Sequence, residues 1–158
     1  FRTQLHKYPN LIVLNTMSKA WASASIRMGM AFASAEIIAL FNKVKYPYNI
    51  NKLTQDHASA LIDDAFKVQR WVAQIKEERA HMIPAFIELP VCLKVYPTGA
   101  NFVLAKVTDA DAIYHYLVDR GVIVRNRNRV EMCQGCLRIT IGTPQENNEL
   151  LSALRQYK

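Results

Sequence analysis

The stretch LIVLNTMSKAWASASIRMG, from Leu11 to Gly29, decides the fold of this protein. It begins with a short, continuous apolar run (residues 11–14), which is typical of a strand that is buried on both faces, as in a parallel sheet covered by helices. A polar loop follows, and a second apolar run at residues 28–33 predicts a second strand. Because α/β proteins place ligands beyond the ends of buried strands, this loop is a candidate binding site.

The loop places two of its hydroxyl groups next to a lysine and carries an arginine further on. Thr16 and Ser18 lie three and one residues before Lys19, and Arg27 lies eight residues after it, close to Gly29. Hydroxyls and an arginine are suited to hold a phosphate, whereas a lysine beside a cation can form a Schiff base with an aldehyde. The alternative for Lys19 is a solvated lysine at the start of a helix, and the loop by itself leaves both interpretations open.

The rest of the chain predicts helices and then an α+β unit. Ser34 is placed to cap a helix over residues 35–43, and a long helical stretch follows at 53–89, with a bend or break expected near Pro84. After it, Asp109 and Thr143 are placed to cap two further helices. Strands are predicted at residues 93–96, 101–107, 122–124 and 137–141.

The composition limits the classes of partner. The chain has 158 residues and a formal net charge of +7, from 20 Lys and Arg against 13 Asp and Glu, which favours anionic partners. The arginines between Arg120 and Arg129 keep a nucleic-acid-binding module open, although stacking aromatics and a known motif are lacking there. No apolar run approaches the roughly 20 residues of a membrane span, and no signal peptide is evident. We therefore expect no membrane partner.

The cysteines and histidines do not indicate a metal site. Cys133 and Cys136 form a CxxC pair, which is compatible with half of a zinc site or with a redox pair. Because no second pair stands at ligand spacing and the four histidines are scattered, we favour a buried structural role for Cys136 and expect no metal. An odd number of cysteines, three, favours a reduced cytoplasmic protein.

Five segments together resemble a known family. They are YPNLIVLNTMSKAW, IRMGMAFAS, NKVKYPYNIN, GVIVRNRN and CLRITIGT, and the last two form the more specific pair. In these segments the chain resembles the C-terminal part of the fold-type I, pyridoxal-phosphate-dependent aminotransferases, and most of all the histidinol-phosphate aminotransferases. The resemblance implies an α/β fold: the C-terminal end of a large cofactor-binding domain with two strands of its sheet (1–52), linking helices (53–89) and a small α+β domain (90–158).

The resemblance also implies a role for each residue of the loop. Lys19 would form the Schiff base with pyridoxal 5'-phosphate and then act as the general base that moves a proton at the substrate Cα. Thr16, Ser18 and Arg27 would hold the cofactor phosphate. The family usually has glycines at the positions of Ala22 and Ser25, so any of these positions that needs a positive φ would be strained here.

Two arginines of the last strands would bind the substrates. By resemblance, Arg138 would bind the carboxylate of the amino or keto acid, and Arg125 would bind the phosphate of a phosphorylated amine. Because the two predicted strands are neighbours in the chain, we expect both arginines to be aimed at one anion site. The alternatives from the residues alone are a surface ion pair for Arg138 and a solvated basic patch for Arg125, Arg127 and Arg129.

The implied activity is amino transfer between histidinol phosphate and 2-oxoglutarate in histidine biosynthesis, by a homodimer in the cytoplasm, with small-molecule substrates and no nucleic-acid partner. Two alternatives remain: another aminotransferase or pyridoxal-phosphate lyase for an amino acid or amino phosphate, and a non-catalytic basic binding module. The chain opens on Phe1 rather than Met, and no residue matches the family's upstream aspartate for the pyridine nitrogen. We therefore expect a fragment that is inactive alone.

Overall fold

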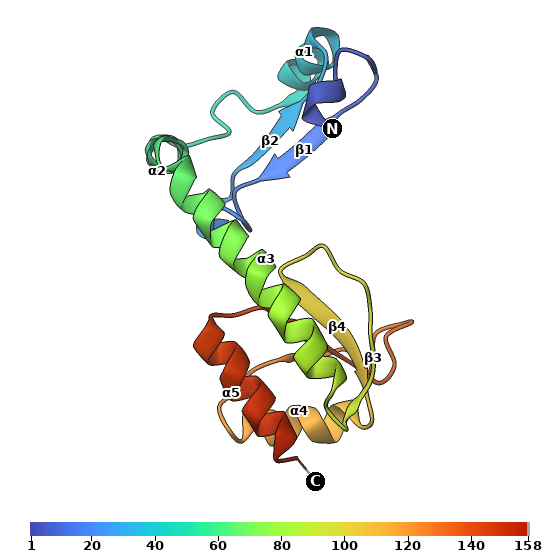
Figure 1. Cartoon of the computed structure of the whole chain (residues 1–158). Coiled ribbons are helices and arrows are strands. Elements are labelled where there is room, and N and C mark those ends of the chain that lie inside the picture. Colours follow the sequence, from blue (N-terminus) through green and yellow to red (C-terminus); the bar gives the residue numbers. More distant parts are fainter. Residues whose placement is uncertain (158) are drawn as a thin grey trace. The chain divides into compact units, whose positions relative to one another are not determined.

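The computed structural model describes residues 1–157, which form two compact units. The first unit spans Phe1–Trp71 and the second begins at Val72, so that the division falls inside a long helix. Figure 1 shows the elements of both units in chain order. Each unit has its own sheet.

The first unit is built on a two-stranded antiparallel sheet. β1 (Val13–Thr16) pairs with β2 (Gly29–Phe32) in a register that sets Thr16 opposite Gly29. The Ser34 side chain accepts a hydrogen bond from the backbone N–H of Ile37, as the cap prediction requires. The other elements of the unit are the 3₁₀ turns η1 (Arg2–Gln4) and η2 (Ala24–Ile26) and the helices α1 (Ala35–Val44) and α2 (Lys52–Asp63).

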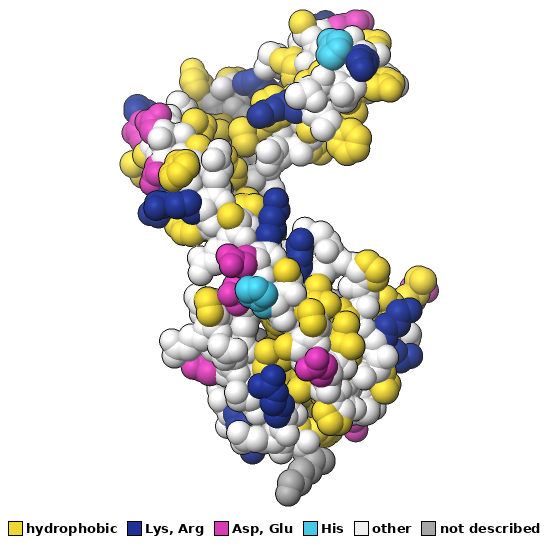
Figure 2. All heavy atoms as spheres, viewed as in Figure 1, with side chains coloured by type: hydrophobic (Ala, Val, Ile, Leu, Met, Phe, Trp, Pro, Cys, Tyr) yellow, Lys and Arg dark blue, Asp and Glu magenta, His cyan; other side chains and the backbone are white. Residues whose placement is uncertain are grey.

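The prediction that the first strand is buried on both faces is wrong for this chain. β1 begins later than predicted and has an antiparallel partner, and its Leu14 side chain is 76% exposed. The apolar run encodes strand formation, but burial also requires neighbours, and within residues 1–157 the sheet has only two strands. Large hydrophobic side chains therefore remain at the surface, where Figure 2 shows them in yellow.

The long helical stretch consists of two helices rather than one. α2 ends at Asp63, and α3 (Ala65–Ile87) starts one residue beyond the break at Asp64. α3 continues through Pro84 to Ile87, so the break lies at Asp64 and not at the proline. Pro84 lies in the last turn of the helix and is exposed there.

The second unit is an α+β sandwich around one hydrophobic core. Its four antiparallel strands have the order β3-β4-β6-β5. Val103, Ala105, Leu137 and Ile139 alternate along the two central strands and point to one face, where residues of α3, α4 and α5 pack on them (Figure 1). The elements are β3 (Cys92–Val95), β4 (Phe102–Val107), α4 (Ala110–Val118), β5 (Arg125–Asn126), β6 (Cys136–Thr140) and α5 (Pro144–Arg155).

The caps of the last two helices are confirmed. Asp109 accepts hydrogen bonds from the N–H groups of Asp111 and Ala112, and Thr143 forms a capping box with Glu146. The predicted strand at 122–124 is wrong, because strand pairing begins only at Arg125 and covers two residues.

Candidate cofactor loop and anion site

The pairing of β1 with β2 closes the loop at residues 17–28. Thr16 at the end of β1 faces Gly29 at the start of β2, and the N–H of Met17 donates to the Met28 carbonyl at 3.2 Å. A Cβ on Gly29 would lie 3.4 Å from the carbonyl oxygen of Asn15, so the two strands approach closely here. The hairpin therefore holds both ends of the predicted cofactor loop together.

The two hydroxyls of the loop lie side by side. Thr16 Oγ1 and Ser18 Oγ are 3.0 Å apart, and the backbone N–H of Ser18 donates to Thr16 Oγ1 at 3.1 Å. Thr16 is the last residue of β1, and Ser18 lies in the turn that follows, directly before Lys19. An oxyanion placed there can accept from hydroxyl and backbone donors together.

Arg27 closes the loop in an unusual backbone conformation. Its φ is +53°, in the left-handed region, and its Nη1 donates to the Ala24 carbonyl at 3.0 Å. The side chain is exposed. This bond uses one N–H of the guanidinium, which leaves further donors for an anion.

Lys19 lies at the surface at the start of a tight turn. Its side chain is exposed, and its carbonyl accepts a hydrogen bond from the N–H of Ala22 at 2.8 Å. Ala22 has a φ of +52°, whereas Ser25 is not left-handed. Of the two positions where the family has glycine, only Ala22 therefore carries backbone strain.

α2 anchors the loop through residues that the sequence did not single out. Ser23 is 6% exposed, its hydroxyl donates to the Trp21 carbonyl at 3.0 Å, and it lies 3.3 Å from Nε2 of His57. Met17, the first residue of the loop, is completely buried. The sequence gives no signal for this contact, because nothing in the pattern couples residues 34 positions apart.

The second unit brings the two predicted substrate arginines together. Arg125 of β5 and Arg138 of β6 are directly opposite each other in the antiparallel register. Directly paired residues point to the same face of a sheet, so the two guanidinium groups share one face. This is the face of the sheet that points away from the core, and the binding of one anion by both arginines stays a prediction.

Arg138 lies over an aromatic ring, and one N–H of its guanidinium has no hydrogen-bond acceptor among the described residues. Its Cζ lies 5.1 Å from the centroid of the Phe102 ring, and its Nε is buried without a hydrogen-bond partner among residues 1–157. A buried unpaired N–H is costly unless a ligand satisfies it. The stacked guanidinium is therefore poised to donate to an anion.

The same face of the sheet is strongly basic. Leu104 of β4 is paired with Arg138, and Lys106 lies two residues further along β4, on the same face. Lys94 of β3 is paired with Lys106 and therefore shares this face. In the part of the chain that the structure describes, the sole ion pair joins Lys52 to Asp56 in the first unit. None of the cations on this face is thus neutralised by a carboxylate.

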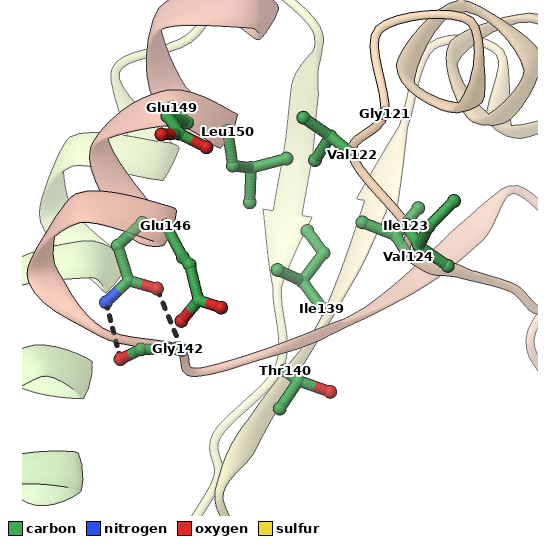
Figure 3. A pocket seen from close by; sticks show the side chains of 11 residues that line it. Gly121, Val122, Ile123, Val124, Ile139, Thr140, Gly142, Glu146, Glu149 and Leu150 are labelled. Atoms are coloured by element: carbon green, nitrogen blue, oxygen red, sulfur yellow. Dashed lines mark hydrogen bonds between the residues drawn. The ribbon is translucent and has the colours of Figure 1, made fainter.

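A separate pocket of about 440 Å³ is lined by the segment 121–124, the end of β6 and α5 (Figure 3). Val122, Ile139 and Leu150 form apolar walls, and Glu146 and Glu149 of α5 supply carboxylates. Hydrogen bonds from the Thr143 N–H and hydroxyl hold the pKa of Glu146 below its ordinary value, which keeps it charged. An acidic, apolar pocket does not suit a phosphate or carboxylate ligand.

Residues 1–157 contain no cluster of three His, Cys, Asp or Glu side chains that could hold a metal ion. Burial raises the pKa of the Cys136 thiol, and the Cys136 N–H donates to the Cys133 carbonyl at 3.0 Å. No helix within the described range is long and apolar enough to cross a membrane.

Comparisons with known proteins show the family of the chain. The family model for aminotransferase class I and II matches residues 1–154. The chain belongs to this family. It is 54% identical over all 158 residues to a histidinol-phosphate aminotransferase of Bacteroides fragilis, and 51% identical over the same span to that of Bacteroides thetaiotaomicron, in each case covering 46% of the relative.

Its fold is also that of solved aminotransferases. The histidinol-phosphate aminotransferase of Clostridium acetobutylicum has a TM-score of 0.87 over 98% of this chain and 48% of that chain, at 24% identity. The predicted fold class, part of a fold-type I aminotransferase, is confirmed. The chain spans about half the length of the curated relatives it matches.

Proposed function

We propose that this chain is part of a pyridoxal-phosphate-dependent aminotransferase that exchanges an amino group between histidinol phosphate and 2-oxoglutarate. Family membership supports the reaction class, and the relatives at more than 50% identity carry this activity in their names. The observation that carries the substrate assignment is the register of Arg125 and Arg138, two unneutralised cations opposite each other. Both substrates are anionic, and such a pair suits a phosphate or a carboxylate.

The loop of the first unit has a donor set that fits pyridoxal phosphate. The hydroxyls of Thr16 and Ser18, 3.0 Å apart, and the Arg27 guanidinium are donors for a phosphate group. Lys19 follows these hydroxyls directly and offers an amine for an aldehyde. We assign the cofactor phosphate to Thr16, Ser18 and Arg27, and the cofactor aldehyde to Lys19.

Each residue of the proposed site then has its own role in the reaction. Pyridoxal phosphate, when bound, supplies the electron-withdrawing ring that stabilises negative charge at the substrate Cα. Lys19 Nζ would move a proton between the substrate Cα and the C4′ atom of the cofactor, in opposite directions in the two halves of the cycle. Arg138 binds the carboxylate of 2-oxoglutarate or glutamate, whereas Arg125 binds the phosphate of histidinol phosphate.

We propose that the complete protein acts as a homodimer in the cytoplasm. Exposed large side chains of the first unit need protein surface to cover them, which the rest of the complete protein and a second copy can both supply. They include Leu14, Val44, Tyr46, Tyr48, Leu53 and Phe66.

The visible spectrum of the complete protein with added pyridoxal phosphate tests the proposal. Wild-type protein should absorb visible light and transfer an amino group from histidinol phosphate to 2-oxoglutarate, and Lys19→Ala should abolish both. Lys43→Ala, which removes an exposed lysine from the last turn of α1, is the matched control and should retain both. Failure to take up the cofactor, or full activity in Lys19→Ala, would contradict the proposal.

A further inference from the structure

A single carboxylate joins α4 to the strand that carries Arg125. Asp111 lies in the first turn of α4. Its Oδ1 accepts a hydrogen bond from Nδ2 of Asn126 at 2.6 Å, and its Oδ2 accepts one from Nδ2 of Asn128 at 2.8 Å. Both oxygens of the carboxylate are thus occupied by neutral amide donors.

The two asparagines are themselves fixed by the backbone. The N–H of Asn128 donates to Oδ1 of Asn126 at 2.8 Å, and the N–H of Gly135 donates to Oδ1 of Asn128 at 2.8 Å. Gly135 directly precedes β6. The network therefore ties α4, β5 and the start of β6 to one another through side chains.

β5 needs such support because it is very short. It contains only Arg125 and Asn126, and its register with β6 covers two residue pairs. Successive side chains of a strand point to opposite faces, so Asn126 reaches Asp111 on the helical face while Arg125 points to the basic face. Fixing the asparagine consequently fixes the direction of the arginine.

We propose that Asp111, Asn126 and Asn128 form a positioning network that holds Arg125 opposite Arg138 for an anionic substrate. This inference rests on the proposed function, since it concerns the site where Arg125 binds the phosphate. Like charges directly opposite in a sheet repel each other, and a two-residue strand would relax by turning Arg125 away. The network opposes this relaxation, so the arginine pair is pre-organised before the anion arrives.

The network also determines which groups bind the Asp111 carboxylate. Arg129 and His115 lie near Asp111, but the hydrogen bonds from the two asparagines are the main cause that lowers its pKa. Because side-chain amides rather than a guanidinium donate to the carboxylate, Arg125 forms no ion pair with Asp111 and its charge is available to a ligand. A carboxylate that simply neutralised the arginine cluster would instead compete with the substrate.

Steady-state kinetics of the complete protein with pyridoxal phosphate tests the network. Asp111→Asn removes the carboxylate and sets an amide against the two amide donors, so KM for the phosphorylated amine should rise about tenfold. We expect kcat and KM for 2-oxoglutarate to change less than about threefold, because Arg138 and Lys19 are untouched. Asp111→Glu, which keeps both oxygens, should restore part of the loss.

Two further variants keep the test decisive. Asp119→Asn makes the same charge change at the other end of α4 and should leave every parameter unchanged. Asn128→Ala removes one of the two bonds to Asp111 without altering α4, and it serves if Asp111→Asn does not fold. It too should raise KM for the phosphorylated amine selectively.

Arg125→Ala separates this inference from the proposed function. If Arg125→Ala raises KM for the phosphorylated amine but Asp111→Asn and Asn128→Ala do not, the positioning role is wrong and the substrate role stands. If Arg125→Ala has no selective effect, both are wrong. Equal increases of KM for both substrates in Asp111→Asn would also overturn the positioning role, since a general loss of structure would produce them.

Discussion

Arg125 and Arg138 face each other across β5 and β6, with both guanidinium groups on the face of the sheet that points away from the core. Arg138 is stacked on Phe102, and neither arginine has a carboxylate partner within residues 1–157. Opposed like charges weaken a sheet unless something neutralises them. The fold therefore retains an unfavourable pair that an anion would relieve.

Inorganic phosphate should stabilise this chain through that pair. A ligand that binds only the folded state stabilises it by RT ln(1 + [L]/Kd), so the melting temperature rises with the phosphate concentration. Arg125→Gln removes the repulsion, so in chloride it should raise the free energy of unfolding by up to about 1 kcal/mol, and its response to phosphate should shrink. Thermal melting in phosphate and in chloride of equal ionic strength measures both effects.

The matched control for this experiment is Arg155→Gln. Arg155 lies in the last turn of α5, away from the strands, and its loss should leave the response to phosphate unchanged. An equal response of Arg125→Gln and wild type to phosphate would contradict the prediction.

Ala22 should be a source of strain in the cofactor loop. Its φ of +52° costs a residue with a Cβ about 1–2 kcal/mol, and glycine avoids this cost. Glycine also gains entropy in the unfolded chain, so Ala22→Gly should stabilise the protein by a net amount of about 0.5–1 kcal/mol. Chemical denaturation measures the change.

Ser25→Gly is the corresponding control at the second position where the family has glycine. Because Ser25 is not left-handed, glycine there relieves no strain and should lower stability slightly. The same stabilisation in both variants would show that strain at Ala22 is not the cause.

Local signals explain what the sequence could predict. Ser34, Asp109 and Thr143 cap their helices as expected, because a cap depends on one side chain and the next three backbone groups. The spacing also predicted that Arg125 and Arg138 belong to successive strands, but the strand expected at 122–124 ended before Arg125, so their direct pairing was not predicted. Predicted domain boundaries at 52/53 and 89/90 and the roles of the site residues stay predictions.

Contacts between distant positions explain what the sequence could not predict. The burial of the first strand depends on neighbours, and the apolar residues at 122–124 line a pocket instead of pairing as a strand. Ser23 meets His57 and Asp111 meets Asn128 only after folding. Single asparagines and histidines in a sequence carry no signal for such partners.

The stability of the second unit should depend on pH through Glu146. Hydrogen bonds from the N–H and hydroxyl of Thr143 lower the pKa of this carboxyl in the folded state. Glu146 therefore contributes stability above its unfolded pKa, and this contribution is lost as the pH falls through the lower folded pKa. Glu146→Gln should flatten the acid limb of a plot of unfolding free energy against pH.

Thr143 provides two variants that check the same cap. Thr143→Ala should cost about 1 kcal/mol at neutral pH because α5 loses its N-cap. Thr143→Ser keeps the hydroxyl and should preserve both the stability and the acid limb. An unchanged acid limb in Glu146→Gln would show that other carboxyls determine the pH dependence.

Pro84 should lower the stability of α3. Helical bonding continues past it, since the N–H of Glu88 donates to the Pro84 carbonyl at 3.2 Å, but proline has no N–H for the carbonyl of Ala80. Proline is about 3 kcal/mol less favourable than alanine inside a helix, and the stiffer unfolded chain offsets about 1 kcal/mol of this. Pro84→Ala should thus raise the free energy of unfolding by about 1–2 kcal/mol.

Urea denaturation measures this gain, and Pro90→Ala is its control. Pro90 lies in a turn outside the helices, so alanine there restores no helical hydrogen bond and should bring no gain. Pro84 is exposed, so its replacement leaves the buried Phe86 and Leu89 in place. A loss of stability in Pro84→Ala would mean that the proline ring directs the end of α3 onto the core, which outweighs the missing hydrogen bond.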